Sequence, residues 1–223
     1  MLNKSQQEIL IRSAATGWVM EPDAKRLFAL AGLPVPNNRW LKTREELPGL
    51  DLPWPVAAKI VSPSVVHKSE VGGVAIGLRT QNELEDFYHR MEPLPDFAGI
   101  LVEELVAPGV ELIIGAKTDK QFGPIILVGL GGITAELYDD VTIRLAPLDH
   151  SDVGAMIKKL KAGRLLTGFR GSPPIAMDQL SRVLIDFSHL VMDLAAEVAS
   201  IDINPLICTP DGITIADARI MLA

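Results

Sequence analysis

The apolar positions of the chain fall into short runs separated by polar stretches, which is the pattern of strands and turns in a folded domain. "WPVAAKIV" is the first such run, and segments rich in Val, Ile and Leu recur downstream at similar length. Their length and β-branched content predict strands. These strands are predicted at 54–61, 73–78, 99–106, 110–119 and 122–131.

Other segments carry apolar residues at helical spacing. "EPDAKRLFALAGLPVP" predicts an amphipathic helix from Glu21 that stops at Gly32 and Pro34, because neither residue favours continuation of a helix. "TQNELEDFYHRMEPL" predicts a second helix over 80–94, with the Thr80 hydroxyl as its N-cap. Polar helices are also predicted at 1–18, 151–162 and 177–194.

The chain closes with "ASIDINPLI", the turn "CTPDG" and "ITIADARI", which predict a hairpin. Proline early in the turn and glycine at its exit are typical of a type I turn centred on 210–211. Counting outward from this centre places Asn204 opposite Asp217 and Asp202 opposite Arg219. Strand alternation puts Asp202 and Asn204 on one face.

This predicted pairing is compatible with a metal site. Opposed side chains have Cβ atoms roughly 4.5–5.5 Å apart, so the oxygens of Asn204 and Asp217 can share one cation. A carboxylate and an amide suit Mg²⁺, which takes its remaining ligands from water and phosphates. The same spacing also fits the polar outer face of an edge hairpin, with Asp202 and Arg219 forming an ordinary cross-strand ion pair.

Strands and helices are interleaved, but hairpins dominate the second half, so the predicted fold class is α+β rather than a doubly wound sheet. "LPDFAG" near 94–99 is the best candidate for a boundary between two lobes. The predicted organisation is an N-terminal helical extension over 1–20, a first lobe over 21–98 and a second lobe over 99–223.

Composition narrows the possible functions. Of the 223 residues, 48% are hydrophobic and 22% charged, which is the composition of a folded domain. The net charge of -7 argues against a nucleic-acid partner, because phosphate contacts need clustered lysine and arginine. A single nucleotide is still compatible with this charge, provided that Mg²⁺ and a few local cations neutralise its phosphates.

The single cysteine, Cys208, excludes an internal disulfide and suits a reducing compartment. The N-terminal segment has no apolar signal-peptide core, and "GPIILVGLGGI" is too short to span a bilayer. We therefore expect a cytoplasmic protein with no membrane partner.

Two glycine-containing loops are candidate phosphate sites. Lys59 is the one charge in "PVAAKIV", and "SPSVVHKSEVGGV" follows it with the hydroxyl of Ser62, the imidazole of His67 and the pair Gly72–Gly73. Glycines allow backbone N–H groups to approach phosphate oxygens. Neither a Walker A loop nor a G-x-G-x-x-G fingerprint occurs. A snorkelling strand lysine and a loop histidine bonded to backbone explain the same residues.

The second cluster, "LVGLGGITAELYDDVTIRLAPL", contains Glu136 and then Arg144, whose apolar flanks predict an inward-pointing phosphate ligand. A glycine bend with a salt-bridged arginine is the alternative. Arg170 lies between two glycines in "GFRGSPP", where it is solvated unless that loop closes over a phosphate. In "VEELVAPGVEL", residues 103–105 are candidates for contacts with adenine and Glu111 for ribose, although a solvated strand end has the same charge spacing.

Five segments together resemble the ATP-grasp subunit of ADP-forming acyl-CoA synthetases, the acetate–CoA ligases related to succinyl-CoA synthetase. They are "KIVSPSVVHKSEVGGVAIGL", "ILVEELVAPGVELIIGAK", "FGPIILVGLGGITAELYDD…TIRLAPL", "LLTGFRGSPP" and "IDINPL…ITIADARI". The resemblance runs from about Asp23 to the C-terminus. The chain departs from the family pattern at Glu70, where Asp is commoner, and at Thr134 in the second glycine loop.

The resemblance implies an ATP-grasp fold of two α+β lobes with ATP or ADP between them. It places Lys59 on the α- and β-phosphates, with residues 103–105 at the adenine and Glu111 on the ribose. It makes Asn204 and Asp217 the Mg²⁺ ligands, with Asp202 beside them. The implied cofactor-binding residues are Lys59, Ser62, Gly72, Gly73, Glu103, Glu104, Leu105 and Glu111, and the implied catalytic residues are His67, Glu136, Arg144 and Arg170.

The implied reaction is acyl-CoA + ADP + phosphate ⇌ carboxylic acid + CoA + ATP. A partner α subunit would bind CoA and carry the main phosphohistidine, so the resemblance implies a hetero-oligomer. His67 is implicated in the phosphate relay, as a nucleophile or as an electrostatic guide. The alternatives are another ATP-grasp carboxylate ligase and a catalytically inactive nucleotide sensor.

Overall fold

The computed structural model describes residues 1–65, 67–131, 140–161 and 163–223. Contacts divide the chain into two compact units, and the chain passes from one to the other more than once. Unit 1 consists of Met1–Val19, Asp23–Val35 and Ala107–Ala223. Unit 2 consists of Met20–Pro22 and Pro36–Val106.

Unit 2 is built on an antiparallel sheet whose four described strands have the order β2-β5-β3-β4. The central position of β5, between β2 and β3, explains why the division by contacts keeps 99–106 in unit 2, whereas the sequence places a boundary at 98/99. The strands are β2 (Asn38–Leu41), β3 (Val56–Ile60), β4 (Val74–Leu78) and β5 (Ile100–Glu104). Two 3₁₀ turns, η1 (Arg44–Gly49) and η2 (Lys68–Val71), lie between them in sequence.

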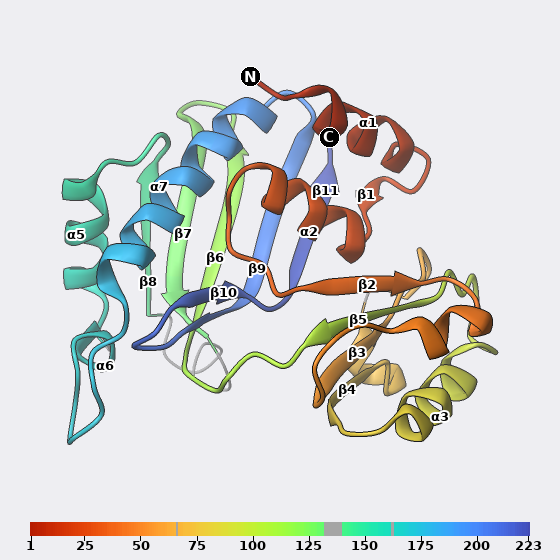
Figure 1. Ribbon diagram of the computed structural model, residues 1–223. Helices are drawn as coiled ribbons and strands as arrows, with labels where there is room; N and C mark the ends of the chain where they lie inside the picture. Colours follow the sequence, from red (N-terminus) through yellow and green to blue (C-terminus); the bar gives the residue numbers. More distant parts are fainter. Residues whose placement is uncertain (66, 132–139, 162) are drawn as a thin grey trace. The chain divides into compact units, whose positions relative to one another are not determined.

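Helix α3 (Gln81–Met91) covers this sheet, in contact with β3 and β4 (Figure 1). The predicted N-cap is confirmed, because the Thr80 hydroxyl accepts a hydrogen bond from the Glu83 N–H at 3.3 Å. The buried residues Leu84, Phe87 and Met91 recur at helical spacing, so one stripe of the helix faces the core of unit 2.

Unit 1 contains the larger sheet, with the order β1-β11-β9-β6-β7-β8 and with β10 paired to β9 among the described residues. Neighbouring strands are antiparallel. The strands are β1 (Trp18–Val19), β6 (Val110–Asp119), β7 (Gly123–Leu130), β8 (Val141–Leu145), β9 (Val198–Cys208), β10 (Ile213–Ile215) and β11 (Ala218–Leu222). Antiparallel sheets with separate helices confirm the predicted α+β class.

Helices cover one face of this sheet, which we call the core face. The long helix α7 crosses it at β7, and α5 packs against both α7 and β8 (Figure 1). Phe28 and Phe187, from α2 and α7, meet edge to face with ring centroids 6.4 Å apart. The helices are α1 (Lys4–Ser13), α2 (Glu21–Leu30), α5 (His150–Lys159), α6 (Gly163–Leu166) and α7 (Met177–Leu194).

The closing hairpin has the predicted register. Ile213 pairs with Cys208 next to the turn, and Arg219 pairs with Asp202 further along. Between these pairs, the Asn204 N–H donates to the Asp217 carbonyl oxygen at 3.3 Å. The pairing deduced from the turn residues is therefore confirmed.

Three strands were missed by the sequence analysis: the two-residue strand β1, at the end of the helix predicted over 1–18, and the strands β2 and β8. β2 has the mixed sequence "NRWL", in which Arg39 is exposed and Leu41 buried, so its apolar run is too short to be noticed. β8 is an edge strand whose apolar residues Val141, Ile143 and Leu145 are about half exposed. In the part of the chain that the structure describes, none of the helices has the length and apolar character needed to cross a membrane.

Candidate functional site

Lys59, the predicted phosphate cation, lies in the interior of unit 2 with carboxylates on two sides. It is the second-to-last residue of β3, and its side chain is 9% exposed. Its Nζ donates to Glu21 Oε1 at 2.5 Å and lies 2.9 Å from Glu103 Oε2. The lysine is therefore held by ion pairs, which explains how a charge is tolerated in an apolar strand.

His67 begins the 3₁₀ turn η2 and is exposed. Its carbonyl oxygen accepts from the Glu70 N–H at 3.2 Å, a bond that closes the turn. The side chain of the next residue, Lys68, is 16% exposed, and its Nζ binds the Glu21 carboxylate. An exposed imidazole thus stands beside an anchored lysine, an arrangement compatible with contact to an incoming phosphoryl group.

The glycine pair after this turn shapes the loop. Gly72 has φ +65°, a conformation that favours glycine, and its N–H donates to the Ser69 carbonyl oxygen. The Gly73 N–H donates to the Lys68 carbonyl oxygen at 2.7 Å, and a Cβ at Gly73 would lie 2.5 Å from Ile60 Cγ2. Both N–H groups are used inside the loop, so the pair shapes the turn and its packing on β3.

Ser62 is likewise used structurally. It is 2% exposed, its hydroxyl donates to the Pro95 carbonyl oxygen at 2.8 Å, and the hydroxyl oxygen accepts from the Ser64 N–H at 3.2 Å. These bonds fix the exit of β3.

The predicted adenine segment, 103–105, ends strand β5. The Glu103 side chain points into the unit and contacts Lys59, and the Glu104 N–H donates to the Asn37 carbonyl oxygen at 3.0 Å. Leu105 lies beyond the strand and is 38% exposed. Of the three residues, Leu105 is the one outside the sheet ladder.

In unit 1, the closing hairpin presents oxygen-bearing side chains on the face opposite the core. Ile201 and Ile203 are buried, whereas Asp202 and Asn204 are exposed, so the predicted alternation is confirmed. Asp217 is half-buried, and one of its carboxylate oxygens accepts from the Ala218 N–H at 2.7 Å. Asp202 also lies 3.8 Å from Arg219, so the predicted cross-strand ion pair is present.

The side chains of Asp202, Asn204 and Asp217 carry the oxygen atoms that a hard cation such as Mg²⁺ prefers as ligands. Two carboxylates and one amide offer oxygen ligands, which Mg²⁺ prefers, and the register brings Asn204 opposite Asp217. No group of three His, Cys, Asp or Glu side chains able to hold a metal occurs within the described ranges, so a dedicated protein cage is absent there. A partly hydrated ion that shares its ligands with phosphate suits this donor set better.

A buried lysine supports the bend that carries Asp217. Lys25 on α2 is 0% exposed, and its Nζ donates to the Ala216 carbonyl oxygen at 2.8 Å. This bond ties α2 to the residue before Asp217. Sequence reasoning missed this lysine, because Lys25 lies inside an ordinary amphipathic pattern.

Glu111, the predicted ribose ligand, is exposed on β6 of unit 1. Its carbonyl oxygen accepts from the Gly131 N–H at 2.8 Å, and a Cβ at Gly131 would lie 3.1 Å from the Glu111 backbone. The glycine therefore allows the end of β7 to approach β6 closely. The catalytic candidate Glu136 and the family departure Thr134 lie outside the described residues.

Arg144 does not join the hairpin residues. On β8 it pairs with Ile126, whose partner on β6 is Ala116, and both of these residues lie on the core face. Its Nε lies 3.8 Å from Asp152 on α5, so the salt-bridged alternative matches the structure. Asp202 pairs with Gly115 and faces the opposite side of the same sheet.

Arg170 lies in an exposed loop with φ +48°, and its guanidinium is 5.3 Å from the centroid of the Phe169 ring. Within the described ranges, Arg170 forms no hydrogen bond or ion pair with another predicted site residue. Cys208 is buried, and desolvation raises the pKa of its thiol to about 12. A thiol that stays protonated at neutral pH is no nucleophile.

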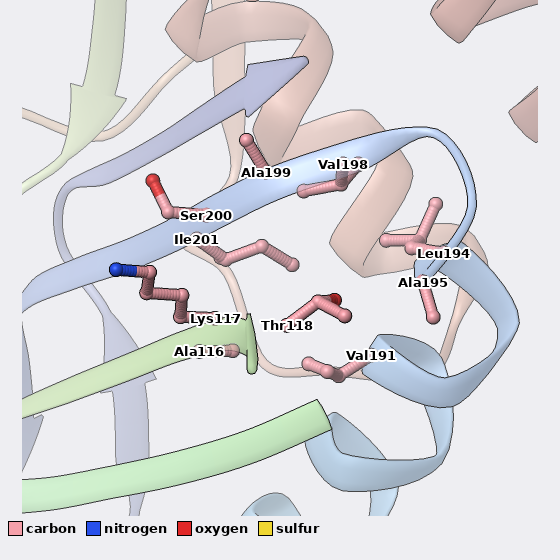
Figure 2. Close-up of a pocket in the computed structure, with 10 residues that line it drawn as sticks. All are labelled: Ala116, Lys117, Thr118, Val191, Leu194, Ala195, Val198, Ala199, Ser200 and Ile201. Carbon is pink, nitrogen blue, oxygen red and sulfur yellow. The ribbon is translucent and has the colours of Figure 1, made fainter. Parts of the chain in front are cut away.

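A small depression beside the first residues of β9 lacks the oxygen-bearing side chains of the hairpin site. Figure 2 shows it between β6, β9 and the C-terminal end of α7. Lys117 is the one charged residue among those that line it, and most of the others are apolar. It is therefore a packing feature rather than a candidate active site.

Comparisons with known proteins identify the family. Residues 11–222 match the model of an ATP-grasp domain. The β subunit of ADP-forming acetate–CoA ligase I from Pyrococcus furiosus is 34% identical over 213 residues, which cover 92% of this chain and 91% of that subunit.

Solved structures agree. One of them is acetyl-coenzyme A synthetase 1 of Candidatus Korarchaeum cryptofilum in complex with coenzyme A and Ca-AMPCP. Its sequence is 41% identical, and the two structures superpose with a TM-score of 0.91. The match covers 98% of this chain and 100% of that chain. A second structure of that enzyme contains coenzyme A and Mg-AMPPCP and has its phosphohistidine segment pointing towards the nucleotide-binding site. It is 38% identical, with a TM-score of 0.84, and the match again covers 98% of this chain and 100% of that chain. The chain therefore has the ATP-grasp fold and belongs to the family of β subunits of ADP-forming acetate–CoA ligases.

Proposed function

We propose that this chain is the nucleotide-binding subunit of an ADP-forming acid–CoA ligase. The observation that carries the proposal is the match to the Korarchaeum enzyme, which binds coenzyme A and a nucleotide analogue and which this chain matches at 41% identity over 98% of its length. The chain would interconvert ADP and ATP while a partner subunit binds coenzyme A. The name β subunit in the relatives supports such a partner.

The residues of unit 2 supply positive charge for phosphates in this proposal. Lys59 contacts the α- and β-phosphates, and Leu105 offers backbone groups to adenine because it lies outside the sheet ladder. Phosphoryl transfer depends chiefly on positioning and charge neutralisation, so a buried, oriented ammonium group is well suited to the task.

The residues of unit 1 supply oxygen ligands. Asn204 and Asp217 would hold Mg²⁺, with Asp202 beside them, and Glu111 would accept from ribose hydroxyls. Mg²⁺ supplies neutralisation of the negative charge on the phosphates. We do not assign Arg144 to this site, because it lies on the core face beside Asp152.

His67 is proposed as the residue that handles the transferred phosphoryl group. As a nucleophile, a neutral ring nitrogen would form a P–N bond while the bond to the partner's phosphohistidine breaks. The phosphoryl group would then pass to a β-phosphate oxygen of ADP, which restores the imidazole. As an electrostatic guide, His67 would contact the group without bonding to it.

The test is His67→Ala in the enzyme reconstituted with its coenzyme A-binding partner. Overall turnover is expected to fall by at least about a thousandfold, while ADP affinity of the isolated chain changes less than about twofold, because His67 lies outside the Lys59 cluster. Wild-type turnover in the variant would remove His67 from the reaction. The cytoplasmic location stays a prediction.

A further inference from the structure

A chain of alternating charges runs through unit 2, from Glu103 to Lys59, to Glu21 and to Lys68. Glu103 Oε2 lies 2.9 Å from Lys59 Nζ, which donates to Glu21 Oε1 at 2.5 Å. The second oxygen of Glu21 accepts from Lys68 Nζ. The four side chains are 3%, 9%, 6% and 16% exposed in that order. One carboxylate thus holds two ammonium groups at once.

This arrangement has a physical consequence for both lysines. Two ammonium groups bound to the same carboxylate repel each other, and the repulsion is strong where water is excluded. Glu21 offsets the repulsion and fixes each amine by a charge-assisted hydrogen bond. Without Glu21, Lys59 would keep its contact with Glu103, and Lys68 would lose its ion pair with the Glu21 carboxylate.

We infer that Glu21 is a positioning residue for the nucleotide phosphates and that Lys68 is a second phosphate-contacting cation beside Lys59. The inference rests on the proposed function, because it takes Lys59 as a phosphate ligand. Lys68 directly follows the exposed His67, so fixing its side chain also fixes the start of the turn that presents the imidazole. Glu21 therefore sets the position of both cations and of the start of η2.

A simpler electrostatic account predicts the opposite change in nucleotide affinity when the charge of Glu21 is removed. If Glu21 only competed with phosphate for the lysines, removal of its charge would tighten nucleotide binding. If Glu21 positions them, removal of its charge weakens binding, and the loss grows with the number of phosphates. A purely structural role would lower stability without this dependence on phosphate number.

The experiment measures binding of AMP, Mg·ADP and Mg·ATP to the whole chain by isothermal titration calorimetry. The variants are Glu21→Gln, Lys68→Met and the double variant, each checked for folding by circular dichroism. Asp23→Asn is the matched control. Asp23 lies on the same helix as Glu21 and is also buried, at 6% exposed, but its partner is Arg12, whose Nε donates to the carboxylate at 2.9 Å. Each variant keeps the approximate volume of the residue it replaces.

We expect Glu21→Gln and Lys68→Met each to weaken Mg·ATP binding by about tenfold and AMP binding by less than about threefold. The double variant should lose less Mg·ATP affinity than the product of the two single losses, because Glu21 acts partly through Lys68. Asp23→Asn should bind like the wild type. Unchanged or tighter Mg·ATP binding in Glu21→Gln overturns the role of Glu21, and unchanged binding in Lys68→Met overturns that of Lys68. Absence of nucleotide binding by the wild type would instead refute the proposed function itself.

Discussion

Replacement of Lys59 by methionine should destabilise the protein severely. The change keeps an unbranched side chain of similar length but removes the ammonium group that lies 2.5 Å from Glu21 and 2.9 Å from Glu103. Both carboxylates stay in the interior, where their side chains are 6% and 3% exposed. Removing one partner of a buried ion pair costs about 3–5 kcal/mol, because the remaining charge has lost its compensation.

For a chain of this size, each kcal/mol shifts the unfolding midpoint by about 2–4 °C, so Lys59→Met should lower it by about 6–20 °C. Thermal unfolding followed by circular dichroism at pH 7 measures the shift. Lys120→Met is the control, because Lys120 is exposed in the turn after β6, and its midpoint should stay within about 2 °C of the wild type.

A second variant shows whether Lys59→Met is destabilised by the loss of charge compensation or by the loss of side-chain packing. Lys59→Met combined with Glu103→Gln removes a carboxylate together with its cation, so it should recover part of the lost stability. A midpoint of Lys59→Met within about 2 °C of the wild type would refute the account of a tightly held buried charge. Absence of any recovery in the double variant would show that Glu103 is not the group left uncompensated.

Two further predictions concern the framework of the site. Gly73→Ala should lower the thermal midpoint, at a cost of about 1–3 kcal/mol, because the new Cβ would lie 2.5 Å from Ile60 Cγ2 and 2.8 Å from the Lys68 carbonyl oxygen; an unchanged midpoint would contradict this packing. Asp149 caps α5, and the Asp152 N–H lowers the pKa of its carboxyl. Asp149→Ala should therefore be less stable than the wild type at pH 7, and the difference should vanish in chemical unfolding as the pH falls through that lowered pKa; a pH-independent difference would refute the capping role.

The sequence predicted best where local chemistry determines structure. The turn "CTPDG" was enough to set the register of the hairpin, because the residues of a tight turn determine the pairing of the strands beside it. The Thr80 cap and the α3 helix followed from local signals in the same way. These features depend on residues close together in the chain.

Contacts between residues far apart in the chain could not be predicted from local sequence patterns. Glu21 reaches Lys59 across 38 positions, and the pattern around Glu21 indicates only the start of an amphipathic helix. Apolar neighbours suggested that Arg144 points inward to a phosphate, and Arg144 does lie on the core face, but there it lies beside Asp152 of α5. Which side of a sheet a residue occupies depends on the strands that pair with it.

The central claim is that this chain binds a magnesium–nucleotide complex through the oxygens of its closing hairpin. The direct measurement is isothermal titration calorimetry of ATP with and without Mg²⁺, for the wild type, Asn204→Ala and Asp217→Ala. The wild type should bind Mg·ATP more tightly than ATP alone. Both variants should lose that gain, about tenfold or more, while keeping their affinity for metal-free ATP. Unchanged Mg·ATP affinity in both variants would contradict the account.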